Sequence, residues 1–112
     1  MANYLYLFRG GEMAKMSPQE MQENMGRWRA WIGGLAQKGH HKGGEPLADG
    51  GVTLRGKKQA LTDGPFGETK DVVGGWLLVE APNLNAAVEL ARGCPIFERE
   101  AGSLEVREVR GM

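Results

Sequence analysis

The chain has 112 residues, 41% of them hydrophobic and 25% charged, which is the composition of one globular domain with a core. Its 14 basic and 14 acidic side chains cancel, so no net charge attracts nucleic acid or an anionic membrane surface. The single cysteine excludes an internal disulfide framework and a cysteine-rich metal site.

We therefore treat residues 1–112 as a single domain with no metal and no cofactor. Residues 1–9 are too short and too quickly charged to form a signal peptide. No segment approaches the ~20 consecutive apolar residues of a membrane span. One unpaired cysteine suits a reducing compartment, and we expect a cytoplasmic protein.

The first two predicted elements are a strand and a long helix. Residues 4–8 are an aromatic-rich run that two glycines end, which is typical of a strand. Ser17 and Pro18 are typical of a helix start, and Gly39 of a helix end. Between them, the spacings of apolar residues alternate between four and three, which predicts the buried stripe of the helix: Met21, Met25, Trp28, Ile32 and Leu35.

The middle of the chain is predicted to hold a strand end and a small hairpin. Residues 43–47 are the strand end, and residues 52–54 and 59–62 are the two strands of the hairpin, with Gly56 in its turn. Residues 63–67 are a loop rich in glycine and proline, which separates the hairpin from the next strand.

A strand, a helix and a strand follow. Residues 76–79 are a short apolar run and residues 104–107 alternate in polarity, so both are predicted strands. Asn83 caps the second helix, and Gly93 and Pro95 end it. One face of this helix is expected to be apolar: Leu84, Ala87, Val88 and Ala91.

The order of the elements predicts an α+β fold. It is βαββαβ with an inserted β-hairpin, and two helices on one face of an antiparallel sheet give a ferredoxin-like layer. Successive side chains of a strand point to opposite faces of the sheet, and in residues 4–8 and 76–79 the side chains on both faces are hydrophobic. Because a bare apolar sheet face is too large a patch for a monomer, we expect a second copy to cover it in a two-fold homodimer.

Several segments together carry a resemblance to a known family: residues 4–9, 17–21, 43–47, 62–70, 74–76, 87–95 and 106–107. The most distinctive of them reads TDGPFGETK, from Thr62 to Lys70. With these segments the chain resembles, over nearly its whole length, the YCII-related proteins of the DGPF subfamily. The resemblance implies a dimeric α+β barrel, in agreement with the strand argument, but it implies no function, because this subfamily is largely uncharacterised.

The wider YCII group has a proposed catalytic pair, a His on the first helix and an Asp just after the second. Residues 16–38 of this chain contain no His, and residues 93–95 contain no Asp. The resemblance therefore implies the fold of this chain but does not imply the catalytic pair.

Asp63 is the main candidate for chemistry. It can act as a general base or a hydrogen-bond acceptor, with Phe66 as an apolar wall that raises its pKa. Gly64 and Pro65 break regular structure beside it, so we predict that Gly64, Pro65 and Phe66 border a ligand pocket near the dimer interface. The alternative is that Asp63 only organises a turn through its own side chain.

His40, Glu45 and Glu68 are further candidates. His40 and His41 are the only histidines, and neighbouring residues of a strand face opposite sides, so they do not act as a pair. His40 is the candidate acid–base partner of Asp63, and the alternative makes both histidines ordinary connector residues. Glu45 and Glu68 are candidate ligand-binding carboxylates, and the alternative places them on the solvated surface. No histidine spacing suits a metal.

Two classes of function fit these residues. In the first, the dimer binds a small polar metabolite without turnover. In the second, it is a small enzyme that uses acid–base chemistry centred on Asp63. Cys94 follows a helix C-terminus, where the helix dipole opposes a thiolate, so we expect a buried thiol. The absence of a complete nucleophile, dyad or metal set favours ligand binding and leaves enzymatic activity open.

Overall fold

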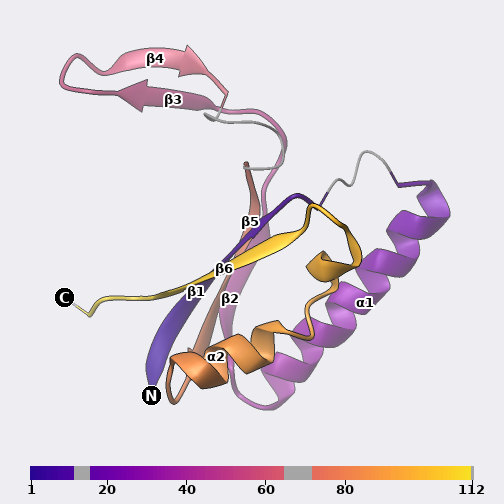
Figure 1. Cartoon of the computed structure of the whole chain (residues 1–112). Coiled ribbons are helices and arrows are strands. Elements are labelled where there is room, and N and C mark those ends of the chain that lie inside the picture. Colours follow the sequence, from indigo (N-terminus) through magenta and orange to yellow (C-terminus); the bar gives the residue numbers. More distant parts are fainter. Residues whose placement is uncertain (12–15, 65–71, 112) are drawn as a thin grey trace.

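A computed structural model describes residues 1–11, 16–64 and 72–111. It contains a four-stranded antiparallel sheet with the strand order β2-β5-β1-β6. The strands are β1 (Ala2–Arg9), β2 (His41–Pro46), β5 (Val73–Ala81) and β6 (Ser103–Glu108). Helices α1 (Pro18–Gln37) and α2 (Leu84–Ala91) lie on one side of this sheet (Figure 1). The predicted ferredoxin-like α+β fold is therefore confirmed.

The first helix begins and ends where the sequence predicts. The Ser17 hydroxyl oxygen accepts a 3.1 Å hydrogen bond from the Glu20 backbone N–H, which satisfies one of the free donors of the first turn. At the other end Gly39 has φ +82°, the left-handed conformation that glycine adopts without strain. Local side chains thus fix both ends of α1.

The predicted buried stripe of α1 is wrong at one position. Met25 is 43% exposed, whereas the neighbouring Asn24 is only 4% exposed. Successive side chains of a helix are about 100° apart around its axis, so Met25 faces solvent when Asn24 faces the core. Asn24 can lie inside because its amide nitrogen donates a hydrogen bond to Glu98.

The core lies between the helices and the facing side of the sheet. Tyr6 is fully buried there, with its ring stacked on Trp31 at a centroid distance of 6.2 Å. Its hydroxyl donates a hydrogen bond to the backbone carbonyl of Ala87 in α2. Leu77 and Val79 of β5 are buried on the same side of the sheet. One aromatic side chain thus ties β1 to both helices.

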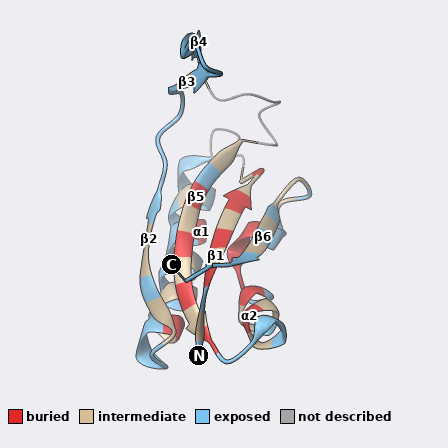
Figure 2. Cartoon of the chain, turned by 90° about the vertical axis from the view of Figure 1, so that its left-hand side faces the viewer, coloured by how far each residue is buried: buried red, intermediate tan, exposed pale blue. Residues whose placement is uncertain are grey.

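The opposite side of the sheet, which we call the open face, is also apolar at its centre. The cross-strand pairs Leu5–Leu78 and Leu7–Trp76 of β1 and β5 occupy it. All four side chains are partly exposed in the single chain. Figure 2 looks onto this face, with α1 behind the strands. The predicted hydrophobicity of both sides of these strands is therefore confirmed.

Strands β3 (Val52–Arg55) and β4 (Ala60–Asp63) form a separate two-stranded antiparallel sheet. This is the predicted hairpin, and Gly56 with φ +75° lies in its turn. The hairpin projects away from the main sheet (Figure 1). Among the described residues the two strands make no ladder with the four-stranded sheet.

The segment after β5 is capped as expected. The Asn83 side-chain oxygen accepts a 2.8 Å hydrogen bond from the Ala86 N–H at the start of α2. Ala87 and Ala91 are buried, but Leu84, predicted on the same apolar face, is 50% exposed because it lies in the first turn. A short 3-10 helix, η3 (Pro95–Glu98), follows and leads into β6. None of the helices described is long and apolar enough to span a membrane.

Candidate functional site

The predicted loop site lies at the base of the hairpin. Asp63 is the last residue of β4 and is exposed. The Gly64 N–H donates a 2.5 Å hydrogen bond to the Gly51 carbonyl, and the Gly64 carbonyl accepts a 2.9 Å hydrogen bond from the Thr53 hydroxyl. These bonds close the hairpin at its base. Pro65, Phe66 and Glu68 lie outside the described residues, so the pocket predicted there stays a prediction.

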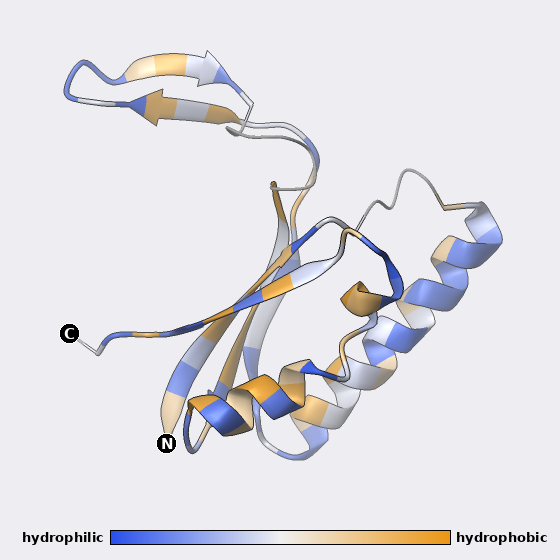
Figure 3. Cartoon of the chain, in the orientation of Figure 1, coloured by the Kyte–Doolittle hydropathy of each residue, from blue (hydrophilic) through white to orange (hydrophobic). Residues whose placement is uncertain are grey.

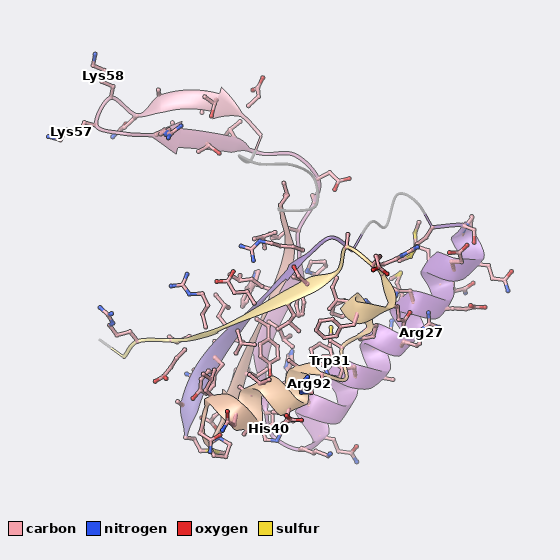
Figure 4. All side chains as sticks on the ribbon, viewed as in Figure 1. Arg27, Trp31, His40, Lys57, Lys58 and Arg92 are labelled. Atoms are coloured by element: carbon pink, nitrogen blue, oxygen red, sulfur yellow. The ribbon has the colours of Figure 1, made fainter. Side chains whose placement is uncertain are left out.

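The other predicted site residues lie apart from Asp63 within one chain. The His40 Nδ1 atom is 2.8 Å from the Glu80 carbonyl oxygen, at the end of the sheet where α1 meets β2 (Figure 4). The hairpin that ends in Asp63 projects from the other end of the sheet. Glu45 is exposed on β2, opposite Trp76 of β5. A single chain therefore does not bring His40 and Asp63 together as an acid–base pair.

The structure does form a polar cleft, which the sequence did not indicate, between α1 and η3. Its volume is about 150 Å³. Side chains from the first half of α1 and from just before it meet side chains from the segment after α2 at its walls: Met16, Glu20, Glu23, Asn24, Arg27, Glu98 and Arg99. Convergent polar groups of this kind can fix the orientation of a small bound molecule.

Glu98 is the centre of the hydrogen bonds in this cleft. Arg27 donates to both of its carboxylate oxygens, from Nε and from Nη2, each at 2.7 Å. The Asn24 amide nitrogen donates to the same carboxylate at 3.4 Å. Asn24 is the only polar side chain that is buried in the described part of the chain. Bidentate pairing and a buried amide hold Glu98 in one orientation.

The charges of the cleft are both acidic and basic. The hydrogen bond from Arg27 holds the pKa of Glu98 below its usual range, and the same bond raises the pKa of Arg27. Both groups therefore stay charged at neutral pH, and Glu98 acts as a hydrogen-bond acceptor there. On the other side of the cleft Arg99 lies 3.7 Å from Glu20. Because Arg99 holds Glu20 only loosely, its guanidinium is the more available donor.

Among the described residues, the fold shifts pKa values away from neutrality. Burial raises the pKa of Tyr6 to about 12 and that of Cys94 to about 12. Burial also raises the pKa of Tyr4. A general acid or base works best with a pKa near the working pH, so none of these shifted groups is suited to proton transfer at pH 7.

Cys94 should be unreactive in the native protein. It is 4% exposed, and the pKa of about 12 leaves it a neutral thiol at pH 7 to 9. We expect labelling by a soluble disulfide reagent at pH 8 to be slower than labelling in denaturant by about 1,000-fold or more. Absorbance of the released thiol measures both rates, and rapid native labelling would show that Cys94 is accessible.

A second groove lies between α1 and α2, with a volume of about 290 Å³. Trp31, Leu35 and Leu90 contribute apolar walls. The indole N–H of Trp31 donates to the Leu90 carbonyl at 3.0 Å, and the described residues that line the groove lack a hydrogen-bonded cluster like the one centred on Glu98. Within the described residues, no group of three or more His, Cys, Asp or Glu side chains is arranged to hold a metal. The cleft at Glu98 is thus the better candidate site.

A family model of the YCII-related domain matches residues 4–112. The chain belongs to the YCII-related family. One solved structure with a similar fold is 5-chloro-2-hydroxyhydroquinone dehydrochlorinase from Burkholderia phenoliruptrix AC1100, in complex with 2,5-dihydroxybenzoquinone. The TM-score is 0.55 at 18% sequence identity, over 100% of this chain and 96% of that chain. At this identity the likeness shows the fold alone. No curated protein matches the chain.

Proposed function

We propose that this YCII-related protein, as a member of the DGPF subfamily, binds a small polar metabolite in the cleft between α1 and η3. The observation that carries the proposal is the fixed carboxylate of Glu98, held by Arg27 and by the buried Asn24. These groups come from segments more than 70 residues apart, with separations of 71 and 74. Groups held in fixed positions beside a cleft are what recognition of a ligand requires, and this is the support for the proposal.

The side chains of the cleft suggest the chemical class of the ligand. Arg27 and Arg99 supply donors, and Glu20 and Glu98 supply acceptors. A compact molecule with both hydroxyl and oxo groups would satisfy both kinds. The dehydrochlorinase of similar fold was solved with 2,5-dihydroxybenzoquinone, a ring that carries such groups. We therefore propose a small hydroxylated or oxo-substituted compound as the ligand.

We propose binding without turnover as the primary role. The support is that the lowered pKa of Glu98 makes it a weak base, and that Cys94 and Tyr6 stay protonated at neutral pH. The structural neighbour is named as an enzyme, so a test of binding should also measure turnover. Catalysis centred on Asp63 is the alternative. It predicts that substitution of Asp63, and not of a residue in the cleft, abolishes activity.

We also propose that the functional unit is a homodimer that pairs the open faces of two sheets. The support is the row of hydrophobic side chains at the centre of the open face: Leu5, Leu7, Trp76 and Leu78. A soluble monomer would leave this row in water. Identical faces related by a two-fold axis bury it in both copies at once.

Titration with 2,5-dihydroxybenzoquinone tests the cleft. Arg99→Gln should raise Kd by about 10-fold to 100-fold, because a charged hydrogen bond contributes roughly 1.5–3 kcal/mol. Arg92→Gln is the matched control, since Arg92 is also paired with a glutamate, Glu89 at 3.1 Å, but lies at the C-terminal end of α2, outside the cleft. Isothermal titration calorimetry gives the Kd values, and loss of the quinone absorbance reports turnover.

Two outcomes would count against the cleft. Equal affinities of Arg99→Gln, Arg92→Gln and the parent protein would remove the cleft from recognition. Loss of binding or turnover in Asp63→Asn, with Arg99→Gln unchanged, would favour the acid–base alternative at the hairpin base.

A further inference from the structure

The β3–β4 hairpin has one hydrophobic face that no other described residue covers. The register pairs Val52 with Asp63 and Leu54 with Leu61, so Val52, Leu54 and Leu61 share one face, with Asp63 at its edge beside the base of the hairpin. Their exposed fractions are 64%, 63% and 64%. Figure 3 shows these hydrophobic stretches on a hairpin that stands clear of the core.

The opposite face of the hairpin is mostly polar. It is made by the other two cross-strand pairs: Thr53–Thr62 and Arg55–Ala60. A two-stranded hairpin is only marginally stable in water unless its hydrophobic face packs on something. This division into an apolar and a polar face therefore indicates a hairpin built to pack on a surface.

The position of the hairpin identifies the surface. It projects from the end of the main sheet on the side away from α1 (Figure 1). In Figure 2, which looks onto the open face, the hairpin stands at the top of the sheet on the side that faces the viewer. The hairpin thus overhangs the open face, and any molecule seated on that face lies beside the hairpin.

The charges around the open face fit a second copy of this chain. The strands and the cross-strand register place three acidic and three basic side chains there: Glu45, Glu80, Glu105, Arg9, Lys42 and Arg107. Some of them already pair within the chain, as Arg9 does with Glu105 at 2.8 Å. A face with equal numbers of both signs can meet its own copy without net repulsion.

We propose that residues 52–63 form an arm that packs its hydrophobic face against the second copy seated on the open face. The proposal rests on the homodimer proposed above. A two-fold axis gives each copy one arm and one receiving surface. The arm of each copy therefore packs on the other copy, and the two arms lie at opposite ends of the dimer. Lys57 and Lys58 at the tip (Figure 4) then stay in water at the polar rim of the interface.

The test compares two hairpin variants by sedimentation equilibrium. Leu54→Ser combined with Leu61→Ser removes the apolar face and should raise the dimer dissociation constant by about 100-fold or more, because each dimer loses four buried leucines. Ala60→Ser on the opposite face is the control and should leave the dissociation constant unchanged. Amide hydrogen exchange in residues 52–63 should slow as the parent protein is concentrated into the dimer.

The outcomes separate the arm from the dimer itself. A parent protein that is monomeric at micromolar concentration would overturn both proposals. A parent dimer whose affinity is unchanged by the double leucine variant would overturn the arm and leave the open-face dimer standing. Protection of the hairpin amides at concentrations where the protein is monomeric would also overturn the arm, because the hairpin would then pack on its own chain.

Discussion

Substituting Tyr6 with alanine is expected to lower the free energy of unfolding by about 3–5 kcal/mol, as for other buried aromatic residues. Tyr6 is 0% exposed and packs between Phe8 and Trp31, with ring centroids 6.5 and 6.2 Å from its own. Its removal leaves a cavity at the meeting point of the sheet and both helices. The total free energy of unfolding of a native protein is only about 5–15 kcal/mol, so the variant should be close to unfolding.

Tyr6→Phe separates the ring from the hydroxyl. It keeps the packing but removes the hydrogen bond to the Ala87 carbonyl, which should cost roughly 0.5–1.5 kcal/mol, the usual net contribution of one hydrogen bond. Phe97→Ala is the control, since Phe97 is 51% exposed and its loss should cost far less. Urea unfolding at one fixed protein concentration measures the stability of Tyr6→Ala, Tyr6→Phe and Phe97→Ala. Equal midpoints for Tyr6→Ala and Phe97→Ala would contradict the central role of Tyr6.

The parts of the fold that the sequence predicted are those that local chemistry decides. Ser17 and Asn83 cap their helices because each oxygen bonds a backbone N–H three residues away. The alternation of residues 4–8 follows from strand geometry alone. The choice between Met25 and Asn24 needed more, because hydrophobicity favoured Met25 and the fold buried Asn24.

The candidate cleft could not be predicted for a related physical reason. Asn24 and Arg27 differ from ordinary surface residues of a helix only because Glu98 comes to lie beside them, and nothing local marks that contact. One signal was present in the spacing. Positions 21, 24, 28, 31 and 35 repeat at three and four residues, so an asparagine at 24 on the buried side required a polar partner from elsewhere.

The dimer proposal predicts a large effect from one charge on the open face. Leu78→Glu should raise the dimer dissociation constant by about 1,000-fold or more. Leu78 pairs with Leu5 at the centre of the face, so each dimer would bury two unpaired carboxylates, and each costs several kcal/mol to desolvate. The fold should survive, because Leu78 points away from the core.

Gln22→Glu is the control for Leu78→Glu, since it adds the same charge at an exposed position of α1. Sedimentation velocity at micromolar concentration should show a dimer for the parent protein and for Gln22→Glu, and a monomer for Leu78→Glu. Far-ultraviolet circular dichroism checks that the monomer is folded. A folded Leu78→Glu protein that still sediments as a dimer would place the interface elsewhere, and the hydrophobic row on β1 and β5 would then need another partner.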